Sequence, residues 1–209
     1  MPSVNTRAFF SKMDRAKYIS HLDLSNVVIR AIRRTKLPVW QTEGFNPRTY
    51  VTFMLPLSLG QEGEHEAMDF RLTEDVPYPE VMDRLNAALP ADIRVTSVTV
   101  PKDKNTDITA ARYMIDSSAD PEKLRALCEK PEINVEKRTK KGSAIVDLKP
   151  LMTDLEFDGG ILRVTLPAGT TFNINPSLLF EAYAAEYGER VKRLRIVRTN
   201  IYSGEREFE

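Results

Sequence analysis

The chain has few side chains of the types that carry acid–base or nucleophilic catalysis. It contains two histidines, His21 and His65, and one cysteine, Cys128. His21 opens a predicted helix, where a histidine could act as a general base. His65 stands between two glutamates, but a lone histidine with loop carboxylates is a poor metal site. We therefore expect no metal and no cofactor, and His21 is a weak catalytic candidate whose commoner role is packing.

A single cysteine excludes both an internal disulfide and a multi-cysteine metal cluster. Cys128 falls beside Leu124 and Leu127 on a predicted helix, so we expect it to be a small core residue. The sequence also lacks a glycine-rich dinucleotide motif, a Walker A motif and any C-x-x-C pair. These absences favour a binding protein over an enzyme.

Positively charged residues gather in three parts of a chain whose formal net charge is zero. They lie on the predicted first helix, around a predicted hairpin turn, and before and within the last predicted strand. The residues that we expect to bind RNA or a partner protein are Arg30, Arg33, Arg34, Asn46, Arg48, Lys140, Lys141 and Arg198. A polarised surface of this kind can steer a polyanion despite zero net charge. The same charges could equally serve only to solvate exposed faces.

The stretch from Gly44 to Gly60 reads first as a turn and then as a strand. Gly44 can adopt a positive φ angle, and Pro47 keeps the residue before it extended. Residues 50–55 are β-branched, aromatic and aliphatic, as in strands. Arg48 stands at the junction, where its side chain can meet a ligand. The rings that could stack on RNA bases beside it, if they are not needed in the core, belong to Trp40, Phe45 and Tyr50.

The elements that must position these residues alternate in two similar sets. Before residue 101 the patterns predict strands at 6–10, 39–42, 50–55, 67–72 and 93–100, an acidic loop at 62–66, and helices that begin after Ser20 and at Pro79. After residue 108 they predict strands at 111–115, 133–138, 143–148, 151–157, 161–166 and 191–202, and helices that begin after Asp120 and Asn175. We therefore predict an α+β fold of two ferredoxin-like (β-α-β-β-α-β) halves, residues 1–101 and 108–209, packed together. The predicted core includes Val28, Ile32, Phe53, Leu55, Val164 and Leu179.

Composition points to a soluble globular protein. The 209 residues are 42% hydrophobic and 29% charged. No apolar run approaches the ~18 residues of a membrane helix, and the first residues lack the apolar region of a signal peptide. We expect a cytoplasmic protein with no membrane partner.

Several short motifs, in order along the chain, carry a family resemblance. They are residues 17–23 (KYISHLD), 44–48 (GFNPR), 56–60 (PLSLG), 140–142 with 146–150, 175–176 (NP) and 198–202 (RTNIY). Together they resemble the bacterial radical SAM-linked protein family, whose function is uncharacterised. Asn200 stands where we would expect glycine, but both residues tolerate a positive φ angle.

This resemblance implies a partner. Members of that family are encoded beside, or fused behind, a radical SAM protein with a B12-binding-type domain. The chain would then be the accessory half of such a system, in agreement with its lack of the C-x-x-x-C-x-x-C cysteines that bind an iron–sulfur cluster.

We expect a non-catalytic accessory protein of a radical SAM enzyme that binds structured RNA through a basic face. Two alternatives stay open. In the first, the chain is purely a protein-interaction module, and the same cations bind carboxylates of the radical SAM partner. In the second, it is an endoribonuclease similar to CRISPR repeat-cleaving proteins, with His21 as the base. Those proteins carry a glycine-rich C-terminal loop that residues 190–202 lack.

Overall fold

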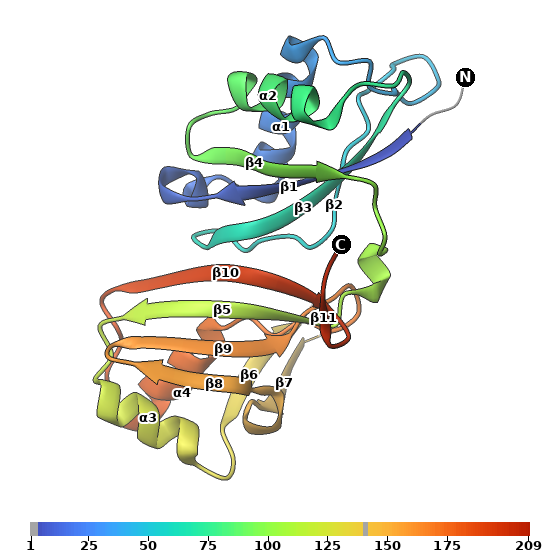
Figure 1. The fold of residues 1–209 in the computed structure, drawn as a ribbon. Coiled ribbons are helices and arrows are strands. Elements are labelled where there is room, and N and C mark those ends of the chain that lie inside the picture. Colours follow the sequence, from blue (N-terminus) through green and yellow to red (C-terminus); the bar gives the residue numbers. More distant parts are fainter. Residues whose placement is uncertain (1–3, 140–141) are drawn as a thin grey trace.

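The computed structural model describes residues 4–139 and 142–209, which form a mixed α+β fold with four α-helices and a mostly antiparallel sheet (Figure 1). The N-terminal part contains β1 (Val4–Lys12), α1 (His21–Thr35), β2 (Thr52–Phe53), β3 (Glu62–Leu72), α2 (Tyr78–Ala88) and β4 (Ile93–Thr99). The C-terminal part contains β5 (Ala110–Ser117), α3 (Pro121–Glu129), β6 (Asn134–Thr139), β7 (Gly142–Asp147), β8 (Thr153–Asp158), β9 (Ile161–Pro167), α4 (Ser177–Tyr187), β10 (Leu194–Ser203) and β11 (Arg206–Glu207). Short 3₁₀ helices lie at Asp14–Tyr18, Asn105–Asp107 and Lys149–Leu151. The predicted α+β class is confirmed.

A nine-stranded sheet connects the two parts. Seven of its strands follow the order β4-β1-β3-β10-β5-β9-β8, with β2 beside β3 and β11 beside β10. The connection between the parts is a short parallel pairing, Glu62 with Val197 and Gly63 with Arg198. The hairpin of β6 and β7 forms a separate two-stranded sheet.

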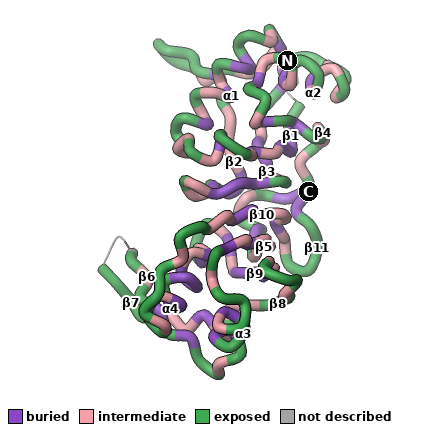
Figure 2. The backbone as a smooth tube through the Cα atoms, turned by 90° about the vertical axis from the view of Figure 1, so that its left-hand side faces the viewer, coloured by how far each residue is buried: buried purple, intermediate pink, exposed green. Residues whose placement is uncertain are grey.

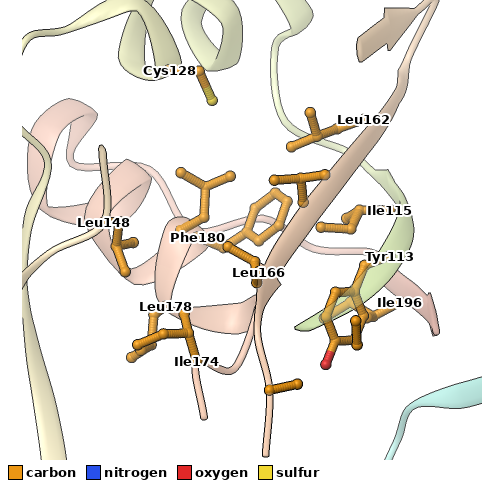
Figure 3. Packing of buried hydrophobic residues seen from close by; sticks show 14 of the residues in the cluster. Tyr113, Ile115, Cys128, Leu148, Leu162, Leu166, Ile174, Leu178, Phe180 and Ile196 are labelled. Atoms are coloured by element: carbon orange, nitrogen blue, oxygen red, sulfur yellow. The ribbon is translucent and has the colours of Figure 1, made fainter. Parts of the chain in front are cut away.

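Helices cover the strands of each part and enclose two apolar cores. In the N-terminal part, Met68, Phe70 and Leu72 of β3 pack with buried residues of α1 and α2. In the C-terminal part, α4 contributes Phe180, which lies beside Leu166 of β9, and Leu178, which lies beside Ile174 (Figure 3). Figure 2 shows buried residues along β3 and β10, where the two parts meet. None of the helices in the described residues is long and apolar enough to cross a membrane.

Local sequence signals set most helix boundaries. The Ser20 hydroxyl accepts a hydrogen bond from the Asp23 backbone N–H at 3.1 Å, as its N-cap position predicts. Asp120 caps α3 in the same way, and Gly188 ends α4 in the left-handed conformation. Of the predicted core residues, Val28, Ile32, Leu55, Val164 and Leu179 are buried, whereas Phe53 is half-buried; Cys128 is buried as expected.

Three sequence predictions were wrong around the Gly44–Gly60 stretch. Residues 39–42 form only isolated bridges, and the strand predicted at 50–55 shortens to β2, because Pro38, Pro47 and Pro56, which lack the N–H donor of a sheet ladder, interrupt this part of the chain. The acidic residues 62–66, predicted as a loop, are the first residues of β3. Glu62 and Glu66 are buried there because arginines distant in the sequence neutralise them.

Candidate functional site

The arginines of α1 lie on its exposed side. Arg30, Arg33 and Arg34 are all exposed, and Arg34 donates a hydrogen bond to the carbonyl of Ala88, the last residue of α2. Within the described residues, no carboxylate pairs with Arg30 or Arg33. These two side chains are free to bind an anion from the helical side of the N-terminal part.

The segment from Thr42 to Tyr50 is a short exposed loop that carries Asn46 and Arg48. Its base is closed by two hydrogen bonds, from Thr42 N to Arg48 O at 2.8 Å and from Arg48 N to Thr42 Oγ1 at 3.0 Å. Gly44 has a φ angle of 120°, which L-residues rarely adopt, so the turn depends on this glycine. The Phe45 ring at the loop tip is fully exposed. The loop therefore presents an aromatic ring and a guanidinium to solvent from a closed base.

A groove of about 510 Å³ lies next to this loop. It is lined by Asn5, Tyr50, Thr52, Met54, Asp69, Phe70, Arg71 and residues 101–105. The guanidinium of Arg71 lies over the Trp40 ring, 5.5 Å from its centroid, and the Trp40 and Tyr50 rings meet edge to face. The groove thus combines aromatic surface with positive charge.

The carboxylates of this groove already have partners. Asp69 accepts hydrogen bonds from Arg7, and Asp103 forms an ion pair with Arg206. Burial raises the pKa of Asp103, but bonds from the Glu209 backbone and from Arg206 outweigh it, and the pKa is lowered overall. Among the described residues, no carboxylate pairs with Arg71 or with Lys104. The groove consequently offers two cations that are not neutralised.

The groove and the α1 arginines lie on opposite sides of the N-terminal strands. Asp69 and Arg71 alternate along β3 with Phe70 and Leu72, which pack in the core with α1 and α2. Alternate residues of a strand point to opposite faces, and Figure 1 shows both helices on one side of these strands. The predicted basic residues do not form one continuous face.

The prediction that Arg198 belongs to an exposed basic face is wrong. It is 3% exposed, and its Nε lies 2.9 Å from Oε1 of Glu66. Its Nη2 donates to the carbonyl of Leu55 at 2.8 Å. A side chain so enclosed is not available to a phosphate, so Arg198 is part of the internal structure. Two further residues of the predicted basic face, Lys140 and Lys141, lie outside the described residues.

The motif stretches noted in the sequence converge on the segment between Met54 and Glu62. Gly60 N donates to Lys17 O at 2.8 Å. The side chain of Asn175 accepts from Gln61 Nε2 at 2.9 Å and donates to Ser58 Oγ at 3.3 Å. Together with Arg198, these contacts fix residues 55–61 against both parts of the chain. Four of the motif stretches, residues 17–23, 56–60, 175–176 and 198–202, therefore act together to hold this segment in place.

Glu62 lies at the end of this segment, and its carboxylate is buried. It accepts from Arg195 Nε at 2.6 Å, from Lys17 Nζ at 3.3 Å and from the backbone N–H of Asp14 at 3.1 Å. Lys12 is also buried nearby; burial lowers its pKa, while Glu66 raises it and Arg198 lowers it further. The geometry of the cluster is that of a structural ion-pair network.

The histidines do not form a catalytic constellation. His21 is exposed, with its ring edge-on to Phe53 at 5.2 Å between centroids, and His65 stacks on Phe9 at 4.4 Å. In the described part of the chain, neither histidine makes a hydrogen bond to a carboxylate. No group of three or more potential metal ligands lies together in that part.

Sequence reasoning missed the central role of Arg7 and the groove cations Arg71 and Lys104. Arg7 is fully buried and binds Asp69, the carbonyls of Asp103 and Glu209, and the face of the Phe208 ring. The sequence did contain a sign of this buried role, because Arg7 is a charged residue inside a strand that is otherwise largely apolar. Nothing in the sequence placed residues 50, 71 and 104 together.

A family model matches residues 5–176, and its description is "uncharacterized protein conserved in bacteria" (DUF2344). No curated protein matches the chain. A crystal structure of an unknown protein from Galdieria sulphuraria is 14% identical, with 93% of this chain and 96% of that chain covered and a TM-score of 0.30. A likeness at that TM-score adds nothing to the description of the fold.

Proposed function

The chain belongs to the family of uncharacterized proteins conserved in bacteria (DUF2344), and we propose that it is a non-catalytic RNA-binding protein. One observation carries the proposal: the exposed ring of Phe45 and the exposed side chain of Arg48 share a short loop beside a groove with Tyr50, Arg71 and Lys104. Proteins that bind unpaired nucleotides combine aromatic surfaces, on which bases stack, with cations that follow the phosphates.

Each group has a distinct role in this proposal. Phe45 stacks on an unpaired base, and Arg48 binds the phosphate next to it. Tyr50 stacks on a second base at the mouth of the groove, while Arg71 and Lys104 bind phosphates along it. Because Asp69 and Asp103 are already bound to arginines, they repel the phosphates less than free carboxylates would.

The substrate is a structured RNA with an unpaired loop or end. Stacking on Phe45 and Tyr50 requires bases that are not enclosed in a helix, since side chains cannot read the deep major groove of paired RNA. Arg30 and Arg33 on the opposite side of the sheet add a second, sequence-independent phosphate contact for the paired part of a long RNA.

The accessory role rests on the motif resemblance to radical SAM-linked proteins. In this proposal the chain holds RNA and presents it to a radical SAM protein that carries a B12-binding-type domain. The contacts around residues 55–61 support a rigid module of two joined parts, as presentation of a substrate requires.

We also propose that the two parts are ferredoxin-like halves. The strand order supports this interpretation: β1 lies between β4 and β3, and β5 lies between β10 and β9. In each part the first strand is thus central, between the last and the third, as in β-α-β-β-α-β folds. The second strand of the N-terminal half is β2, which has only two residues, and the C-terminal half has the β6–β7 hairpin inserted after α3.

Fluorescence anisotropy with labelled RNA stem-loops tests RNA binding, with a fully paired duplex of the same length for comparison. The stem-loop should bind more tightly than the duplex. Phe45→Ala should weaken stem-loop binding about 5- to 150-fold, because a stacked base contributes ~1–3 kcal/mol. Tyr18→Ala is the matched control, since Tyr18 is an exposed ring outside the loop and the groove. Equal binding by wild type and Phe45→Ala would refute the assignment of this loop.

A second candidate function is a pure protein-interaction module for the radical SAM partner. Three large apolar side chains favour it, because Tyr18, Leu22 and Leu59 are each about two-thirds exposed or more. Tyr18 follows Lys17 and Leu59 precedes Gly60, and the hydrogen bond from Gly60 N to Lys17 O connects these two positions. Exposed apolar clusters commonly mark protein contacts. Under this alternative, Tyr18→Ala abolishes co-purification with the partner, and no RNA binds at low salt.

A further inference from the structure

A second groove lies in the C-terminal part, between α4 and the β6–β7 hairpin, which stand side by side in Figure 2. Its volume is about 1040 Å³. The lining residues come from β6 (Glu136, Lys137, Arg138), from the segment 173–177, from α4 and from residues 188–194. No residue of β7 lines it, so the groove borders the edge of β6 that faces away from β7.

The hydrogen-bond register shows which backbone groups this edge presents. β6 and β7 pair without irregularity, and Leu148 N donates to Ile133 O at 2.9 Å at the base of the hairpin. In an antiparallel pair, every second residue bonds across the pair and the residues between direct their N–H and C=O groups outward. Counting from Ile133, the residues that bond to β7 include Val135 and Lys137, and the outward residues include Glu136 and Arg138.

These outward groups have no strand partner among the described residues. β6 pairs only with β7 there, and the hairpin is separate from the nine-stranded sheet. An unpaired strand edge is a template for another strand, and proteins normally cover such an edge or protect it. Here the edge is bordered by a groove of about 1040 Å³.

The opposite wall of the groove suits the side chains of an extended segment. Most of the α4 residues that line the groove are apolar, namely Leu178, Phe180, Ala184 and Ala185, and Gly188 follows at the end of the helix. Val191 and Leu194 add apolar surface at the far end. Every second side chain of an added strand would point toward this wall and meet apolar, shallow surface.

The charges at the groove favour an acidic flank. Arg138 and Arg190 are exposed and have no ion-pair partner in the described residues, and Lys137 is bonded to the carbonyl of Asn173 at 2.7 Å. Two carboxylates, those of Glu136 and Glu181, also line the groove, so the excess charge is positive.

We propose that this groove binds an extended peptide segment of a partner protein by strand addition to β6. The segment carries apolar side chains at alternate positions and an acidic residue near Arg138 or Arg190. Its backbone hydrogen-bonds with the N–H and C=O groups of Glu136 and Arg138, a recognition mode in which the main chain supplies affinity and the pockets supply specificity. The site is separate from the RNA groove and does not depend on the proposed function.

A displayed library of random linear peptides, selected on the whole purified chain, tests the proposal. Selected peptides should show an alternating apolar pattern with an acidic residue. Glu136→Pro removes an outward N–H without breaking a bond to β7, and it should lower the affinity of the selected peptides at least tenfold. The matched control is Ile145→Pro, because Ile145 is paired with Glu136 and its N–H points outward from the other edge of the hairpin. This control should bind as wild type.

Amide hydrogen exchange on the wild-type chain provides a second readout that does not depend on the folding of a variant. Without peptide, the amides of Glu136 and Arg138 should exchange faster than that of Lys137. A saturating selected peptide should slow the first two and leave Lys137 unchanged. The proposal is overturned if no peptide is enriched, if Glu136→Pro and wild type bind equally, or if the two outward amides are protected by concentration-dependent self-association, which would assign the edge to a second copy of the chain.

Discussion

Arg198 and Glu66 form a buried ion pair where the two parts of the chain meet, with Arg198 Nε 2.9 Å from Glu66 Oε1. Arg198 belongs to β10, and Glu66 belongs to β3. The same guanidinium donates to the carbonyls of Leu55 and Pro56, so it also holds the segment that follows β2. A side chain that reads as part of a basic surface in the sequence thus joins three separate segments inside the protein.

Arg198→Ala should lower the free energy of unfolding by about 3–5 kcal/mol, because it leaves the Glu66 carboxylate buried without its partner. Urea denaturation measures this change. The double variant Arg198→Met with Glu66→Leu should lose less, since neither charge is then left unpaired. Arg33→Ala, the exposed control, should leave stability nearly unchanged. If Arg198→Ala were as stable as wild type but bound RNA weakly, Arg198 would be a surface contact and its internal role would be wrong.

Lys12→Met should raise the free energy of unfolding or leave it unchanged. Lys12 is 1% exposed, and burial lowers its pKa because the charged ammonium loses its water. The unfolded chain therefore binds this proton more strongly than the folded chain, and the wild type gains stability as the pH rises toward about 10.5. The stability difference between Lys12→Met and wild type should shrink over that range. A loss above about 2 kcal/mol at pH 7 would instead mean that the ammonium stabilises Glu66.

The sequence was a good guide where local signals decide the structure and a poor one where distant residues do. The caps at Ser20 and Asp120 and the alternation of Met68, Phe70 and Leu72 are local, and they predicted α1, α3 and much of β3. Glu62 was assigned to a loop because its burial depends on Arg195, which lies 133 residues away in the sequence. The groove could not be predicted for the same reason, since Tyr50, Arg71 and Lys104 come from three separate segments.

Cys128 should react slowly with thiol reagents in the folded protein. Burial raises its pKa to about 11, so the reactive thiolate is scarce at pH 8, and the buried sulfur is also shielded. A disulfide reagent followed by absorbance should label it only after denaturation.

The same raised pKa of Cys128 makes the free energy of unfolding depend on pH. Because the folded pKa lies above the unfolded value of about 8.5, the buried thiol makes its full contribution to stability below that pH. It is lost as the pH rises toward 11. Cys128→Ala should not show that loss, and rapid labelling of the native protein would contradict the buried thiol.

The salt dependence of RNA binding should separate the two basic regions of the N-terminal part. For each phosphate contact, the logarithm of affinity falls with the logarithm of salt concentration by about 0.7 to 0.9. Arg48→Ala and Lys104→Ala should each reduce this slope by about one contact for a short single-stranded RNA, because the loop and the groove lie together. Arg30→Ala and Arg33→Ala should leave the slope for the short RNA unchanged, since α1 lies on the opposite side of the sheet. With a long stem-loop, the α1 variants should also reduce the slope, as the paired part reaches the second face. If the α1 variants reduced the slope for the short RNA and Arg48→Ala did not, the primary RNA contact would lie on α1, and the groove would have another ligand.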